Sequence, residues 1–216
     1  MKTAPAGQGS DWREGFLFVG NHLALDFLNT RPAQNGELNE LLPDFEALAR
    51  WFQAAGLLSA DEAAALVRRW ANSPRGRRVL QAALKLRERL RKEVLAGEAG
   101  AGLHRSTIDE LNRLMAEHPM RTRIKAVQET LRQELWFATE RPEDLLGPLA
   151  HGAAALFTEL NRERVRKCEQ CVLHFHDTSK KGNRRWCSMR LCGNRLKVAN
   201  YAARQRSGVI PDGLHE

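Results

Sequence analysis

Apolar residues recur every three or four positions along most of this chain, which is the spacing of helices with one buried face. The pattern predicts helices over residues 43–56, 59–71, 73–97, 107–118 and 143–160. Pro43 suits a first helical position, and Ser59 and Glu62 form a capping box. Ser73 precedes Pro74 at the start of the longest helix. The N-terminal two-thirds is therefore expected to be mostly helical.

Three parts of the pattern are less regular. Ser106 or Thr107 is the expected cap of the fourth helix, and the fifth is expected to turn basic and lead directly to Cys168. Residues 121–138 alternate between apolar and polar, which predicts a half-buried β-hairpin. Residues 21–30 fit either a short helix or a strand, because the segment is too short to fix a period.

Composition places the chain among globular proteins. It has 216 residues, of which 43% are hydrophobic, so it is long enough for a core and for two modules. No apolar run reaches the ~18–20 residues that span a bilayer, and the N-terminus lacks the apolar run of a secretory signal. We expect a soluble, cytoplasmic protein, with residues 1–14 as a disordered lead-in.

The positive charge is concentrated near the C-terminus. The whole chain has a formal net charge of +8, but residues 161–206 hold 13 Lys and Arg against three acids, a net charge of +10. The remainder of the chain is slightly acidic. Such a basic module favours a polyanionic partner over a merely solvated surface.

All four cysteines of the chain lie in this basic region, at Cys168, Cys171, Cys187 and Cys192. Two close pairs separated by 15 residues are typical of a tetrahedral zinc site. Two disulfides are the alternative, which suits secreted proteins, and the spacing matches no familiar iron–sulfur pattern. Four sulfurs would fill the coordination sphere of one structural Zn²⁺, leaving no position for a substrate.

The order of residues around the cysteines predicts a treble-clef-like zinc finger. Cys168–Cys171 forms a knuckle, a hairpin follows with residues 180–183 at its tip, and a helix begins near Ser188. His174 and His176 lie between the cysteine pairs and are expected to be hairpin surface or core residues rather than ligands. The fold class is thus mainly α with a small β-hairpin (α+β). Its domains are a helical domain over 1–160, a zinc finger over 161–208 and a tail over 209–216.

Several polar residues of the predicted finger have the chemistry of nucleic-acid contacts. Arg and Asn side chains read base edges, Lys binds phosphate, and Tyr stacks or donates a hydrogen bond. Residues 190, 194, 197, 201 and 204 would share one face of the predicted helix. The candidates are Lys180, Arg184, Arg185, Arg190, Asn194, Arg195, Lys197, Tyr201 and Arg204.

The run Cys192-Gly193-Asn194-Arg195 resembles the signature of the CGNR zinc-finger family. Cys168-x2-Cys171, Phe175-x-Asp177-x-Ser179 and residues 184–189 are similar to the rest of that family's pattern. Residues 20–30 are similar to the ABATE-type domain that precedes this finger in many bacterial proteins. The resemblance implies a bacterial, stress-related transcription regulator whose finger binds DNA.

The sequence leaves several functions open. The leading hypothesis is a DNA-binding regulator with a helical domain that senses an effector or forms a homodimer; RNA binding and docking of an acidic protein partner are alternatives. His22, Asp26 and Asn29 are candidates for a small-molecule effector pocket. The first two would share a helix face, but with no nucleophile motif nearby they are more typical of a capped or surface polar pair than of a catalytic dyad. We expect no enzyme.

Overall fold

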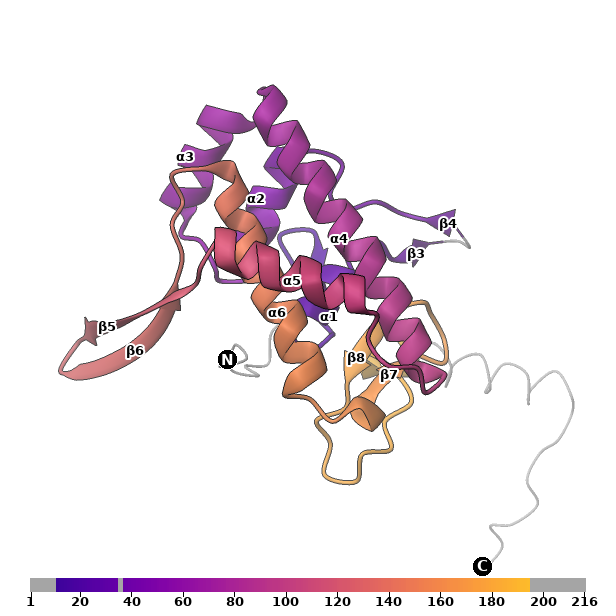
Figure 1. The fold of residues 1–216 in the computed structure, drawn as a ribbon. Coiled ribbons are helices and arrows are strands. Elements are labelled where there is room, and N and C mark those ends of the chain that lie inside the picture. The colour runs from indigo at the N-terminus through magenta and orange to yellow at the C-terminus, as the bar shows by residue number, and fades with distance from the viewer. Residues whose placement is uncertain (1–10, 35–36, 195–216) are drawn as a thin grey trace, which may run out of the picture.

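A computed structural model describes residues 11–34 and 37–194, and within them helices form most of the fold (Figure 1). The long helix α4 (Pro74–Glu98) packs with α1 (Leu23–Leu28), α2 (Phe45–Ala54) and α6 (Leu146–Thr158). Two further helices, α3 (Ala60–Trp70) and α5 (Arg105–Glu117), pack on α2 and α6 respectively. The predicted helical domain is confirmed. No helix among the described residues is long and apolar enough to cross a membrane.

Two helix starts agree with the sequence signals. The Ser59 hydroxyl accepts a hydrogen bond from the Glu62 N–H, and the Glu62 carboxylate accepts one from the Ser59 N–H, which completes the predicted capping box of α3. Ser73 caps α4, and Pro74 occupies its first turn.

Two other starts differ from the prediction. Asp44 caps α2, so Pro43 lies outside the helix rather than at its first position. His104 caps α5 through its Nδ1, which accepts the N–H of Ser106. Thr107 lies inside α5 instead, where its hydroxyl donates to a neighbouring glutamate. In both cases a polar side chain one or two residues away satisfies the free N–H groups.

The ambiguous segment 21–30 contains helix α1. Its residues Leu25, Phe27 and Leu28 are buried, and the Phe27 ring lies 5.4 Å from the Trp51 ring of α2. His22 caps the start of α1 and Asn29 its end. Tertiary burial on the helix face therefore decides between helix and strand.

The described strands pair only as two-stranded antiparallel hairpins. The pairs are β1 (Trp12–Arg13) with β2 (Phe16–Leu17), β3 (Ala33–Gln34) with β4 (Glu37–Leu38), β5 (Arg121–Val127) with β6 (Thr130–Trp136), and β7 (Val165–Lys167) with β8 (His174–His176). The first pair corrects the expected lead-in, because residues 11–14 belong to an ordered hairpin.

The β5–β6 hairpin confirms the alternation over residues 121–138 but not its burial. Its strands are almost entirely exposed on both faces, and the hairpin projects away from the helices (Figure 1). Gln128, at the turn, has a φ of 53°, the left-handed conformation that tight hairpin turns require. The expected half-burial was wrong because no element of the described chain covers the apolar side.

The last helix also ends earlier than predicted. A 3-10 turn, η1 (Pro142–Leu145), leads into α6, which ends at Thr158 rather than continuing to Cys168. A second 3-10 turn, η2 (Arg162–Arg164), follows, with the Asn161 side chain accepting from the Glu163 N–H. Strand β7 then carries the chain to the first cysteine.

Candidate metal centre

The first cysteine pair lies in the loop of the β7–β8 hairpin. Strand β7 pairs with β8, and the N–H of Cys168 donates to the carbonyl of Leu173 across the loop at 2.8 Å. The hairpin therefore encloses the Cys168–Cys171 knuckle. This corrects the sequence interpretation, which placed the hairpin after the knuckle with residues 180–183 at its tip.

Residues 177–186 instead form a loop organised by the carboxylate of Asp177. This side chain is fully buried and accepts hydrogen bonds from the N–H groups of Ser179 at 2.9 Å and Arg184 at 2.8 Å. Burial alone would raise its pKa, but the hydrogen bonds lower it to about 2. The loop is thus closed by one charged acceptor rather than by strand pairing, and it delivers the chain to Cys187.

The second cysteine pair lies around a short helical turn. The Ser188 hydroxyl accepts from the N–H groups of Arg190 and Leu191, so Ser188 caps the turn η3 (Met189–Gly193) that carries Cys192. The predicted helix start near Ser188 is confirmed. The remainder of that predicted helix lies outside the described residues.

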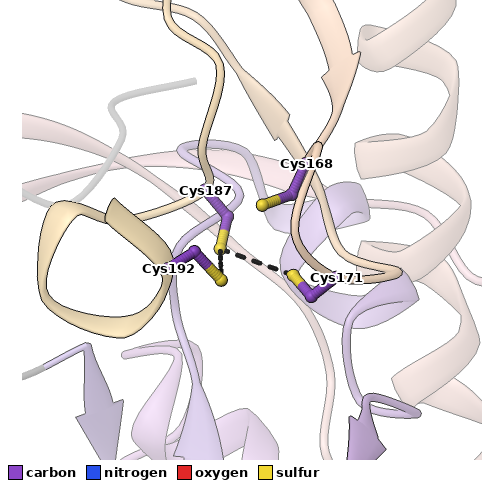
Figure 2. Close-up of side chains that lie close together, drawn as sticks. All are labelled: Cys168, Cys171, Cys187 and Cys192. Atoms are coloured by element: carbon purple, nitrogen blue, oxygen red, sulfur yellow. Dashed lines mark hydrogen bonds between the residues drawn. The ribbon is translucent and has the colours of Figure 1, made fainter. Parts of the chain in front are cut away.

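The four sulfurs converge on one point (Figure 2). All four lie within 4.8 Å of one another; Cys187 Sγ is 3.8 Å from Cys171 Sγ and 3.7 Å from Cys192 Sγ. A tetrahedral Zn²⁺ with Zn–S bonds of ~2.3 Å separates its sulfurs by ~3.8 Å. All four cysteines are free thiols, so the geometry fits one zinc ion rather than two disulfides.

Electrostatics favours a cation between these sulfurs. Hydrogen bonds from Cys171 and Cys187 lower the pKa of Cys168, whereas hydrogen bonding to Cys168 raises the pKa of Cys171 to about 12 and also raises that of Cys187. The cluster thus ionises one thiol readily and resists further negative charge. A bound dication offsets part of the negative charge of four adjacent thiolates and so stabilises them.

Arg184 supports the metal centre from outside. Its Nε donates to the carbonyl of Trp186 at 2.7 Å, its Nη2 donates to the carbonyl of Cys187, and its guanidinium lies 4.8 Å from the centre of the buried Phe175 ring. These contacts hold the backbone on both sides of the third ligand. Arg184 was predicted as a nucleic-acid contact, but its guanidinium is engaged within the finger.

The other nucleic-acid candidates fall into two groups. Lys180, Arg185, Arg190 and Asn194 are exposed, although Arg185 forms an ion pair with Glu169 (Nη2–Oε2, 2.6 Å) and covers the Trp186 ring. The other four candidates lie outside the described residues: Arg195, Lys197, Tyr201 and Arg204.

Neither histidine of the finger joins the sulfur cluster. His174 is buried, and its Nε2 lies 3.2 Å from a carboxylate oxygen of Glu98 at the end of α4. His176 is half-buried, and burial lowers its pKa. The metal-binding group found among the described residues consists of the four cysteines.

The N-terminal segment completes the core of the finger, which the sequence did not indicate. Leu17 and Val19 pack in one buried cluster with the finger residues Leu173 and Phe175 and with three of the cysteines. The Ser188 hydroxyl also donates to the Asp11 carboxylate at 2.6 Å. The finger therefore shares its core with residues more than a hundred positions earlier in the chain.

Asn29 also connects the N-terminal segment to the finger. Its Nδ2 donates to the carbonyl of His174 at 2.8 Å, and its Oδ1 accepts from the N–H of His174 at 3.0 Å. Nearby, the N–H of His176 donates to the carbonyl of Gly20, and the Asn21 side chain donates to the carbonyl of His176. Helix α1 is thereby attached directly to strand β8.

The side chains of the three proposed effector residues form hydrogen bonds within the chain. Asn29 is used as above, and the His22 Nδ1 accepts from the Ala24 N–H at 3.3 Å. The Asp26 carboxylate accepts from the Gly20 N–H at 2.7 Å, and burial raises its pKa to about 7. Within the described chain no hydrogen bond joins the side chains of His22 and Asp26, and none of the three residues lines the groove beside α4 or the three other cavities identified there. The effector pocket stays a prediction.

The architecture just described is that of a helical domain joined to a four-cysteine zinc finger. Residues 21–160 match the ABATE family, whose description reads "putative stress-induced transcription regulator", and residues 164–205 match the CGNR zinc finger. The chain belongs to the ABATE family and binds one zinc ion through its CGNR finger. No match was found among curated proteins.

Proposed function

We propose that this protein is a DNA-binding transcription regulator whose zinc finger contacts the DNA backbone and bases. The observation that carries the proposal is a set of four exposed cations on the finger, at Lys167, Lys180, Lys181 and Arg190. Within the described chain, none of the four lies within ion-pair distance of a carboxylate. Exposed cations that are not held in an ion pair are available for phosphates.

A groove between the finger and the end of α4 extends this basic surface. It has a volume of about 630 Å³ and is lined by five cations and three acids. One of the acids, Glu169, is already paired with Arg185, and Arg166 and Lys167 also line the groove. The groove offers a path for a phosphate backbone beyond the finger itself.

The zinc ion has a structural role in this proposal. Four sulfur ligands complete its coordination, so the chain's own residues leave no position for an activated water or a substrate. Bound zinc would fix the relative positions of the knuckle and the turn η3. We accordingly assign no enzymatic activity to the metal centre.

Duplex DNA is favoured over single-stranded RNA by the state of the finger's aromatic rings. Phe175 is fully buried, and Trp186 is half-buried beneath Arg185. Proteins that bind unpaired bases present exposed rings on which those bases stack. The rings of the described part of the finger instead belong to its core and to internal contacts.

Fluorescence anisotropy of the zinc-loaded protein on a duplex of about 25 base pairs tests the proposal. Affinity should fall linearly with salt on logarithmic axes, and the slope should decrease by about 0.9 for each phosphate contact removed. We expect the double variant Lys180→Ala/Lys181→Ala to bind more weakly with a shallower slope. The matched control is Lys85→Ala, which removes an exposed cation from α4.

Competition with structured RNA of equal length separates DNA from RNA binding. If the affinity does not depend on salt, or if the slope is unchanged in the double variant, the finger does not contact the DNA backbone and the proposal is wrong. If structured RNA displaces the labelled duplex more effectively than unlabelled DNA does, the basic surface binds RNA instead.

A further inference from the structure

The β5–β6 hairpin, called the β-arm below (residues 121–136), has little packing of its own. It projects from the helices with its tip well away from them (Figure 1). Within the described chain, its extensive contacts are those between its own two strands. An isolated two-stranded hairpin is marginally stable in water and normally gains stability by packing one face on another surface.

The two faces of the β-arm differ sharply in chemistry. Residues paired across an antiparallel ladder lie on the same face, and successive residues alternate between faces. One face is charged and carries Arg121, Arg123, Lys125, Arg132, Glu134 and Trp136. The other has no charged residue and carries Thr122, Ile124, Ala126, Leu131, Gln133 and Leu135.

The charged face satisfies its own groups. The guanidinium groups of Arg121 and Arg123 lie 5.7 Å and 5.4 Å from the centre of the Trp136 ring, which they cover. Arg123 also forms an ion pair with Glu134 at 2.6 Å, and the Lys125 ammonium lies 4.0 Å from the same carboxylate. This face thus contains partners for its one aromatic ring and its one acid.

The apolar face has no such cover. Ile124 is 73% exposed, Leu131 is 75% exposed and Leu135 is 50% exposed. Three large aliphatic side chains on one side of a projecting ribbon form a patch of the kind that marks an interaction surface. The charges on the other face keep the patch confined to one side.

We propose that the apolar face of the β-arm packs against the same face of a second copy of this chain. An uncharged face offers no charge attraction to nucleic acid or to a charged protein partner, whereas an identical face matches it in polarity. Two arms packed face to face, about 10 Å apart, direct both cationic faces outward, so that like charges do not meet. Such an isologous contact closes as a two-fold dimer.

The size of the face is that of a weak, transient association. Each strand has seven residues and extends about 24 Å at ~3.4 Å per residue. A ribbon two strands wide and this long is smaller than a standard interface of about 800 Å² per partner. The dimer is therefore expected at micromolar rather than nanomolar concentrations. It does not depend on DNA binding by the finger, although two arms in contact would bring two fingers into one assembly.

Sedimentation velocity of the zinc-loaded full chain, from about 1 to 200 µM, tests the proposal. The wild-type protein should shift from monomer to dimer across this range. Ile124→Glu/Leu131→Glu, which places charges on the apolar face, should remain monomeric throughout. Lys125→Glu/Arg132→Glu is the matched control on the opposite face of the same strands, and it should dimerise at no more than threefold higher concentration.

A second variant guards against local misfolding. Replacing residues 124–133 by Asn-Gly joins Arg123 to Glu134 through a two-residue turn and shortens the arm without touching the helical core. It should also be monomeric, with one zinc per chain and with the helical signal in far-ultraviolet circular dichroism retained. A wild-type monomer at 200 µM, or a dimer that persists in both apolar-face variants, would overturn the proposal.

Discussion

Asn29→Ala should weaken the junction between helix α1 and the zinc finger. The Asn29 amide donates to and accepts from the backbone of His174, and both residues are buried. Alanine leaves one N–H and one carbonyl of His174 without partners. Each unsatisfied buried group costs ~1–3 kcal/mol, so the expected loss for the two groups is ~2–6 kcal/mol.

This loss is large against the total stability of a domain, which is ~5–15 kcal/mol. Urea unfolding followed by tryptophan fluorescence, at a fixed and saturating free zinc concentration, measures it. Because the broken contacts lie in β8, next to the metal centre, the variant should also release zinc faster to a competing chelator.

Asn39→Ala is the matched control, because Asn39 is an exposed asparagine of the same domain. Its stability should change by no more than ~0.5 kcal/mol. If Asn29→Ala loses less than ~1 kcal/mol and retains zinc as the wild type does, the junction does not depend on this amide and the reasoning is wrong.

Three further predictions concern the centre and its surroundings. Cys187→Ser should abolish stoichiometric zinc binding, as measured by metal analysis; retention of a full equivalent would contradict the four-sulfur assignment. Arg184→Ala should speed zinc release to a chelator. Arg185→Ala is the control, because it removes an exposed ion pair and the cover of the Trp186 ring but no side-chain hydrogen bond to the backbone beside Cys187. Asp26 has its pKa raised from 3.8 to about 7, so the wild type should lose up to ~4 kcal/mol as pH rises from about 4 through 7. Asp26→Asn should remove that component, and equal pH profiles of unfolding for the two proteins would refute it.

Local signals in the sequence predicted the helices well. The period of apolar residues located every long helix, and the Ser59 and Ser73 caps fixed two starts, because these signals act within one turn of the chain. The errors at Asp44 and His104 arose where several polar residues near the start compete for the same N–H groups. Choosing among them requires the direction from which the chain enters the helix.

The ligands of the metal centre were predictable from the sequence, but the residues that surround and support them were not. The spacing of the cysteines indicated a zinc site because ligands of one ion must approach each other closely. The contributions of Leu17 and Asn29 were not predictable, since no local pattern connects them to partners near residue 174. Likewise, the basic composition of the finger indicated Arg184 as a nucleic-acid contact, whereas in the fold its guanidinium donates to the backbone carbonyls of Trp186 and Cys187.

The shared core of the finger also has a consequence for biosynthesis. Leu17 and Val19 emerge from the ribosome long before Phe175, which completes their cluster. At a translation rate of ~5–20 residues per second, about 8–30 s pass between the synthesis of these apolar residues and that of Phe175. Zinc capture consequently follows the synthesis of all four cysteines, and it joins the first described residues to the last. A chain that stalls before Cys187, or one made in zinc-depleted cells, would display an incomplete N-terminal segment to proteases and chaperones.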